Sequence, residues 1–146
     1  MHSDYFDLLA EFNAQSVEYL VVGAHAMAAH GHVHATRDPD VWVRPDAQNA
    51  RRVLTALRRF GAPLHDRSEH DLTQPGLIFQ IGVEPLRIEI VTAIDGVEFE
   101  QAWPERLIAE FAGAAVPVLS KSHLIERKRA AGRLRDLADI ERLQGQ

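Results

Sequence analysis

Residues 19–43 read YLVVGAHAMAAHGHVHATRDPDVWV, and this stretch decides the fold. Its first residues complete a short β-branched and aromatic run, residues 17–22, that is typical of a buried strand. The Ala-rich residues 24–30 then predict a short helix packed on that strand and stopped by a glycine. Charged and apolar residues alternate over residues 38–43, which predicts a half-buried second strand.

Outside that stretch, apolar periodicity predicts further helices and strands on both sides. The expected helices are 3–16, 46–60 and a tail from 120 that breaks near Gly132; the expected strands are a hairpin of 77–81 and 86–91, and 116–119. These elements make an α+β fold, with a mixed central β-sheet flanked by helices and with C-terminal helices. The chain has 146 residues, 46% of them hydrophobic, and no repeat or linker, so we expect a single domain over 1–146.

The composition excludes several classes of protein. No apolar run approaches the roughly 18 residues of a membrane span, and the N-terminus is acidic rather than signal-like, so we expect a cytoplasmic protein without a membrane partner. The lack of cysteine excludes disulfides and thiolate metal sites, which favours hard cations. Residues 120–146 carry seven Lys/Arg against four Asp/Glu, although the whole chain has a formal net charge of −5. This basic tail can therefore meet a phosphate or an acidic partner.

Two aspartates stand at the start of the second predicted strand. The strand period of two places the carboxylates of Asp38 and Asp40 on one face, and convergent carboxylates suit Mg²⁺. Glu89, between two isoleucines, is expected on the open face of another strand, where it would complete a cluster suited to phosphoryl transfer. An alternative stays open, in which the two aspartates are solvated loop acids and Glu89 is an exposed residue paired with Arg87 or with a cross-strand cation.

Three motifs carry a resemblance to a known family. Gly23-Ala24, followed after thirteen residues by Asp38-Pro39-Asp40, resembles the helix start and Asp-x-Asp motif of the polymerase-β-like nucleotidyltransferase superfamily. Residues 19–31 and 35–43 look like those of small bacterial nucleotidyltransferase-like proteins related to AbiEii-type toxins. The segment KRAAGRLRDLAD, residues 128–139, is similar to the closing segment of the same group. Together the matches bracket nearly the whole chain.

The resemblance implies a nucleotidyltransferase fold and a set of site residues. It implies that Asp38, Asp40 and Glu89 are the catalytic and metal-binding residues, for Mg²⁺ or Mn²⁺, with Glu89 helping to deprotonate the acceptor hydroxyl. The nucleotide-binding candidates are Gly23, Ala24 and Lys128, which the resemblance implies, and Arg133, Thr36 and Arg37, which we add from their positions. An alternative for Arg37 is an ion pair with Asp38 or Asp40 in the absence of metal.

Helical offsets place Lys128, Asp136 and Asp139 on one face of the tail. Either this face is a salt-bridged solvent face, or Lys128 or Arg133 meets the triphosphate while Asp136 orients it. In the first interpretation an apolar stripe anchors the helix, and that stripe consists of Leu134, Leu137 and Ile140.

The leading hypothesis is a metal-dependent nucleotidyltransferase that transfers a nucleoside monophosphate from an NTP to an unidentified hydroxyl acceptor. Only 57 residues follow Glu89, too few for a large acceptor domain, which favours an RNA or protein acceptor and a toxin-type effector with an antitoxin partner. Ala24, where the superfamily usually has Gly or Ser, and Pro39 motivate a second hypothesis of a nucleotide- or partner-binding module without turnover. A third is an interaction protein whose acidic cluster is incidental. Base preference and oligomeric state do not follow from the sequence.

Overall fold

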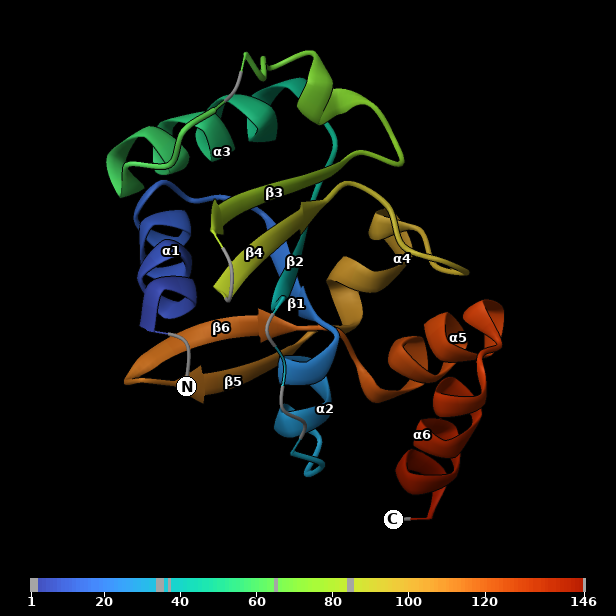
Figure 1. The fold of residues 1–146 in the computed structure, drawn as a ribbon. Helices are drawn as coiled ribbons and strands as arrows, with labels where there is room; N and C mark the ends of the chain where they lie inside the picture. The colour runs from blue at the N-terminus through green and yellow to red at the C-terminus, as the bar shows by residue number, and fades with distance from the viewer. Residues whose placement is uncertain (1–2, 34–35, 37, 65, 84–85, 146) are drawn as a thin grey trace.

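A computed structural model describes residues 3–33, 36, 38–64, 66–83 and 86–145. Within them, six strands form one sheet in the order β3-β4-β2-β1-β6-β5, with helices on both faces (Figure 1). The strands are β1 (Tyr19–Val22), β2 (Asp40–Val43), β3 (Ile78–Val83), β4 (Leu86–Val91), β5 (Leu107–Phe111) and β6 (Ala114–Val118). The α-helices are α1 (Ser3–Ala14), α2 (Ala24–Ala29), α3 (Ala47–Phe60), α4 (Phe99–Ala102), α5 (Lys121–Ala131) and α6 (Leu134–Gln144). Short 3-10 turns cover Asp71–Thr73 and Trp103–Glu105.

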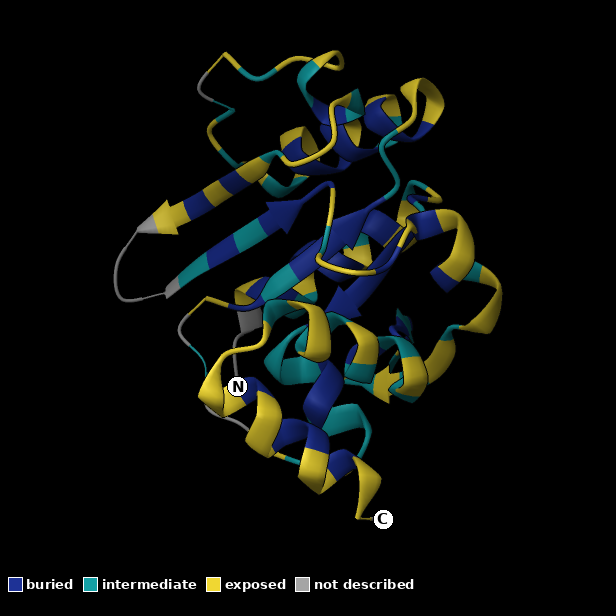
Figure 2. Cartoon of the chain, turned by 90° about the vertical axis from the view of Figure 1, so that its right-hand side faces the viewer, coloured by how far each residue is buried: buried dark blue, intermediate teal, exposed yellow. Residues whose placement is uncertain are grey.

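The sheet is mixed, which confirms the predicted fold class. β1 pairs antiparallel with β2 and parallel with β6, while β2 pairs parallel with β4. Two antiparallel hairpins, β3–β4 and β5–β6, form the two ends of the sheet. Figure 2 shows that the two central strands, β1 and β2, are buried along most of their length, whereas the edge strand β3 alternates between buried and exposed residues. The central strands therefore carry the core, and the parallel β2–β4 pair brings distant segments of the chain together.

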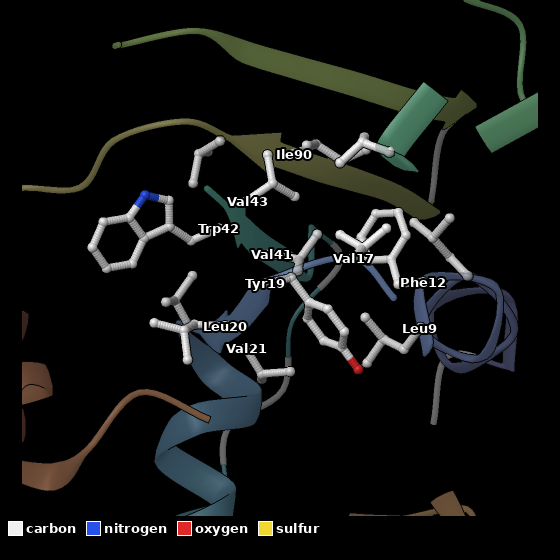
Figure 3. Close-up of a cluster of buried hydrophobic side chains, with 14 of the residues drawn as sticks. Leu9, Phe12, Val17, Tyr19, Leu20, Val21, Val41, Trp42, Val43 and Ile90 are labelled. Atoms are coloured by element: carbon white, nitrogen blue, oxygen red, sulfur yellow. The ribbon is translucent and has the colours of Figure 1, made fainter. Parts of the chain in front are cut away.

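Apolar side chains on the two faces of β2 pack against different helices. Val41 lies on the same side as Leu9 and Phe12 of α1, where all three side chains are buried (Figure 3). Trp42 points to the other side and packs edge-on against Phe99 of α4, with ring centroids 4.9 Å apart. Because successive strand residues point to opposite faces, two layers of helices cover the sheet.

The helix α3 begins and ends where the sequence predicts. The side chain of Asp46 accepts a hydrogen bond from the backbone N–H of Asn49 at 2.8 Å, which caps the first turn. Gly61 ends the helix in the left-handed region, with φ +91°. No helix in the described part of the chain combines the length and the apolar character that a membrane span requires.

One strand of the sheet was not predicted, and another begins later than predicted. β5 was not predicted, because it is an edge strand in which Leu107 and Ile108 are both exposed and the alternation of a half-buried strand is lost. β2 begins at Asp40 rather than at residue 38, and Asp38 lies in a bend. Pro39 has no N–H to donate to the ladder, so regular pairing begins only after it.

Candidate functional site

Parallel pairing of β2 with β4 places Asp40 directly opposite Glu89. The backbone N–H of Glu89 donates to the carbonyl oxygen of Pro39 at 3.0 Å, which fixes this register at the start of β2. Residues in register on neighbouring strands point to the same face, so the two carboxylates lie side by side. The structure thus brings together two acids that come from separate halves of the chain.

The carboxylate of Asp40 is held between a glycine and an arginine. Its Oδ1 packs against Gly23, and its Oδ2 lies 3.5 Å from Nη2 of Arg127 in α5. Burial raises the pKa of Asp40 above its ordinary value of 3.8; the Arg127 guanidinium opposes this rise, and Glu89 adds to it. The backbone carbonyl of Asp40 accepts a hydrogen bond from the hydroxyl of Tyr5 at 2.8 Å. The backbone of Asp40 is therefore held by α1 and its carboxylate by α5.

Gly23 is required where β1 turns into α2. Its φ of +73° lies in a region that residues with a Cβ rarely adopt, and a Cβ added here would overlap Oδ1 and lie 3.0 Å from Cγ of Asp40. Gly23 precedes the first turn of α2, whose leading backbone N–H groups have no acceptor within the helix. The glycine thus allows the helix start and the acid to approach closely.

A cavity of about 530 Å³ lies between the sheet and the α5–α6 helices. One side of it is the carboxylate wall, which consists of Asp38, Asp40 and Glu89. The other side holds the cationic wall, which consists of Arg127, Lys128, Arg133, Arg135 and Arg142, and Asp136 and Asp139 of α6 line the cavity beside these cations. Gly23, Ala24 and Thr36 also line it. Of the candidates from the sequence, these three, the carboxylate wall, Lys128 and Arg133 therefore share one cavity, whereas Arg37 lies outside the described residues.

Two buried aspartates of α6 hold the cations. Nζ of Lys128 lies 2.9 Å from Oδ2 of Asp139 and 3.8 Å from Oδ1 of Asp136. Nε of Arg133 donates to Oδ2 of Asp136 at 2.6 Å. Burial alone would raise the pKa of Asp136, but hydrogen bonds from the Arg133 side chain and backbone lower it below 3.8. The predicted face of Lys128, Asp136 and Asp139 thus turns into the protein.

The leucine stripe predicted to anchor α6 was wrong. Leu134 is 87% exposed and Leu137 is 49% exposed, whereas Ile140 is buried together with the two aspartates. Lys128 of α5 pairs with both buried aspartates of α6, and Arg133 at the start of α6 caps the helix through Asp136. The buried apolar residues of α6 are Ile140 and Leu143.

Two residues of the site were not found in the sequence. Gln80 of β3 donates from Nε2 to Oε2 of Glu89 at 2.9 Å, and Arg87 in turn donates to Oε1 of Gln80 at 3.0 Å, so Gln80 links Arg87 to Glu89. Arg127 was missed as well, although it follows buried Leu124 by three positions, a spacing that places both on one helix face. That spacing was the signal in the sequence that could have identified Arg127.

The donor atoms of the carboxylate wall suit Mg²⁺ or Mn²⁺, which prefer oxygen ligands. The described residues contain no group of three His, Cys, Asp or Glu side chains placed to hold a metal ion. One oxygen of Asp40 and one of Glu89 already contact Arg127 and Gln80. The residues fit an ion held by one or two carboxylates, with substrate phosphates supplying further ligands, as Mg²⁺ commonly is.

Comparison with known proteins supports the fold. No family model and no curated protein sequence matches the chain. Among solved structures, it is similar to the lincosamide antibiotic adenylyltransferase LnuA bound to lincomycin (TM-score 0.62, 18% identity, 99% of this chain and 96% of LnuA). It is also similar to the antibiotic-resistance factor ANT(2'')-Ia (0.66, 15%, 97% and 80%) and to a Thermotoga maritima protein assigned as a nucleotidyltransferase (0.59, 16%, 99% and 93%). The chain therefore has the nucleotidyltransferase fold.

Proposed function

We propose that this protein is a metal-dependent nucleotidyltransferase that transfers a nucleoside monophosphate from a nucleoside triphosphate to a hydroxyl acceptor. The observation that supports this most is the pairing of Asp40 with Glu89 at one cavity that also holds the cationic wall. Carboxylates are the ligands of hard cations, and Arg and Lys recognise phosphate. Both halves of a metal–triphosphate complex therefore have partners here.

In the proposed reaction the acceptor oxygen attacks the α-phosphorus, and the bond from that phosphorus to the oxygen bridging to the β-phosphorus breaks. Pyrophosphate leaves in line with the attacking oxygen. Glu89 takes the proton of the acceptor hydroxyl, while Asp38 and Asp40 hold the metal. Bound Mg²⁺ or Mn²⁺ supplies positive charge that stabilises the phosphoryl oxygens in the transition state.

The proposed phosphate-binding groups come from both sides of the cavity. They are the backbone N–H groups at Gly23 and Ala24, beside the carboxylate wall, and the side chains of Thr36, Lys128 and Arg133. Arg37, which lies outside the described residues, is a candidate from its place in the sequence. Lys128 enters the reaction already oriented, because Asp139 fixes its ammonium group.

The acceptor we favour is a small hydroxyl-bearing molecule. LnuA binds lincomycin, and the present chain covers 96% of LnuA, so a fold of this size needs no further domain to bind a small molecule. The short chain is thus a weaker argument for a macromolecular acceptor than the sequence suggested. An RNA or protein acceptor, in a bacterial toxin-type effector related to AbiEii-type proteins and controlled by an antitoxin, is the second proposal. The demand for nucleoside triphosphates favours the cytoplasm for either reaction.

Label transfer tests the proposal. Purified protein is incubated with each α-³²P-labelled NTP and Mg²⁺ or Mn²⁺, alone, with a panel of lincosamides, aminoglycosides and other polyols, and with tRNA or cell lysate. We expect metal-dependent labelling of one acceptor, abolished by Asp40→Ala and retained by the control Asp7→Ala, which removes an exposed carboxylate of α1. Labelling that persists in Asp40→Ala would contradict the proposed site.

Two observations favour the alternative of a nucleotide-binding module without turnover. The carboxylate wall contains no ready group of three metal ligands among the described residues, and Ala24 offers no hydroxyl to a phosphate. This alternative predicts that NTP and metal raise the melting temperature while no label is transferred to any acceptor. If neither NTP nor metal shifts the melting temperature, both proposals are wrong.

A further inference from the structure

The ion pair between Arg127 and Asp40 joins the two walls of the cavity. Nη2 of Arg127 lies 3.5 Å from Oδ2 of Asp40, across a separation of 87 residues in the chain. The side chains are only 24% and 15% exposed, so solvent screens the pair less than it would a surface pair. Arg127 thus supplies a positive charge at the buried acid that is the first candidate for binding a metal.

Arg127 differs from Lys128 and Arg133 of the cationic wall because its partner belongs to the sheet and not to α6. Lys128 pairs with Asp139, and Arg133 with Asp136, and both of these aspartates belong to α6. Those pairs can persist whatever binds at the sheet. Arg127 instead contacts Asp40 of the sheet, so a cation that binds Asp40 competes directly with the guanidinium.

Both carboxylate oxygens of Asp40 already have neighbours. Its Oδ1 packs against Gly23, and its Oδ2 faces Arg127. A metal that uses Oδ2 therefore competes with Arg127, because two cations at one carboxylate oxygen repel each other. The displaced guanidinium remains in the same cavity, because Arg127 lines it together with Lys128 and Arg133.

We propose that Arg127 exchanges partners during binding: it holds the carboxylate of Asp40 in the nucleotide-free protein and binds a phosphate oxygen once the metal–nucleotide complex has entered. This proposal rests on the proposed nucleotide and metal binding. In it, Arg127 is a substrate-binding residue that also offsets the charge of the buried carboxylate until substrate arrives. Arg suits both partners, because its planar guanidinium binds carboxylate and phosphate oxygens in similar geometry.

The exchange has two consequences of opposite sign. Arg127→Met removes the competitor of the metal, so the affinity for Mn²⁺ without nucleotide should rise, by roughly fivefold for an ion pair of this partly buried kind. The same variant lacks the charge that meets the phosphate, so the affinity for nucleotide in the presence of Mn²⁺ should fall, by about tenfold or more. A purely structural role for Arg127 would weaken both.

Titration calorimetry first measures the affinity for Mn²⁺ in the absence of nucleotide. It then measures, in the presence of Mn²⁺, the affinity for each of the four α,β-methylene nucleoside triphosphates, which resist transfer. The wild-type protein, Arg127→Met, Arg127→Lys and the control Arg129→Met are compared, and a melting curve for each checks folding. Arg129 lies on the same helix, 54% exposed, and pairs with Glu126 at the surface, so its variant should match wild type. Arg127→Lys keeps the charge and should fall between wild type and Arg127→Met.

Opposite changes in Arg127→Met, with Arg129→Met unchanged, support the exchange. If wild type binds Mn²⁺ and nucleotide but Arg127→Met changes neither affinity, or lowers both, the exchange is wrong and the proposed function stands. If wild type binds neither, the proposed function and the exchange are both refuted.

Discussion

Gly23→Ala offers a direct test of how closely the start of α2 approaches Asp40. The added methyl group would overlap Oδ1 of Asp40 and lie 3.0 Å from Cγ and 3.1 Å from Oδ2. Asp40 has little freedom to withdraw, because its backbone carbonyl is bonded to Tyr5 and its side chain is buried beside Glu89. The substitution therefore forces either the carboxylate or the β1–α2 turn to move.

Two costs add at this position. A non-glycine residue at φ +73° and ψ −141° costs about 1–3 kcal/mol in backbone strain. Displacing the packed carboxylate adds roughly 1–2 kcal/mol, the range of an overpacked core contact. The total, about 2–5 kcal/mol, lowers the melting temperature by roughly 5–15 °C in a protein of this size.

Thermal denaturation followed by circular dichroism measures the first effect. The matched control is Gly61→Ala, which also has positive φ, at +91°, but nothing within 4 Å of the added methyl group. The control should lose only about 1 kcal/mol, or roughly 2–4 °C. A second comparison places Gly23→Ala in an Asp40→Ala background, where the overlap is absent and the cost should fall by roughly 1–2 kcal/mol.

Two results would refute this reasoning. One is a melting temperature for Gly23→Ala within about 1 °C of that of Gly61→Ala, because an extra cost of about 1 kcal/mol would separate the two by roughly 2–4 °C. The other is an equal cost of Gly23→Ala with and without the Asp40 side chain, since the close approach would then contribute nothing. We further expect Gly23→Ala to lose the stabilisation by Mg²⁺ and NTP that Gly61→Ala keeps.

Three further changes have expected outcomes. Glu89→Gln removes a like charge beside Asp40 and should raise the metal-free melting temperature by roughly 1–3 °C while abolishing label transfer, and an active variant would exclude Glu89 as the base. Asp136→Asn removes the buried carboxylate that meets Lys128 and Arg133, and it should cost roughly 1.5–3 kcal/mol near neutral pH by urea denaturation, because Lys128 keeps Asp139 and Arg133 is largely exposed. Because the folded-state pKa of Asp136 lies below 3.8, its contribution is present above pH 3.8 and is lost as the pH falls through that lower pKa, so the difference between wild type and variant should shrink in acid and not in base. Tyr5→Phe removes the hydrogen bond to the Asp40 carbonyl and should cost about 1 kcal/mol by the same assay, and no loss would show that water replaces the hydroxyl.

Much of the fold followed from local sequence patterns. The cap at Asp46, the glycine that ends α3 and the break between α5 and α6 are each fixed by residues within one turn of the position they control. The edge strand β5 escaped prediction because exposed Leu107 and Ile108 are held by pairing with β6 and not by burial of one face. Local patterns therefore predict elements whose causes are local.

The partner of Glu89 depended on the register of the β3–β4 hairpin. A turn over the expected residues 82–85 would place Gln80 opposite Arg87, but the strands extend to Val83 and Leu86, so Gln80 lies opposite Glu89. A shift of two residues along one strand keeps every side chain on its face, so the alternation of the two strands is the same in both registers. Periodicity could not distinguish them.

The sequence by itself determined the spacing of Gly23 and the two aspartates, the strand that carries Glu89 and the basic helices of the tail, because each is a matter of neighbouring residues. Only the tertiary structure decided that Asp40 faces Glu89, that Arg127 reaches Asp40, and that two aspartates of α6 turn inward while two leucines remain exposed. The physical reason is that these contacts join segments far apart in the chain, and their free energies depend on which charges end up buried together, which local propensity does not encode.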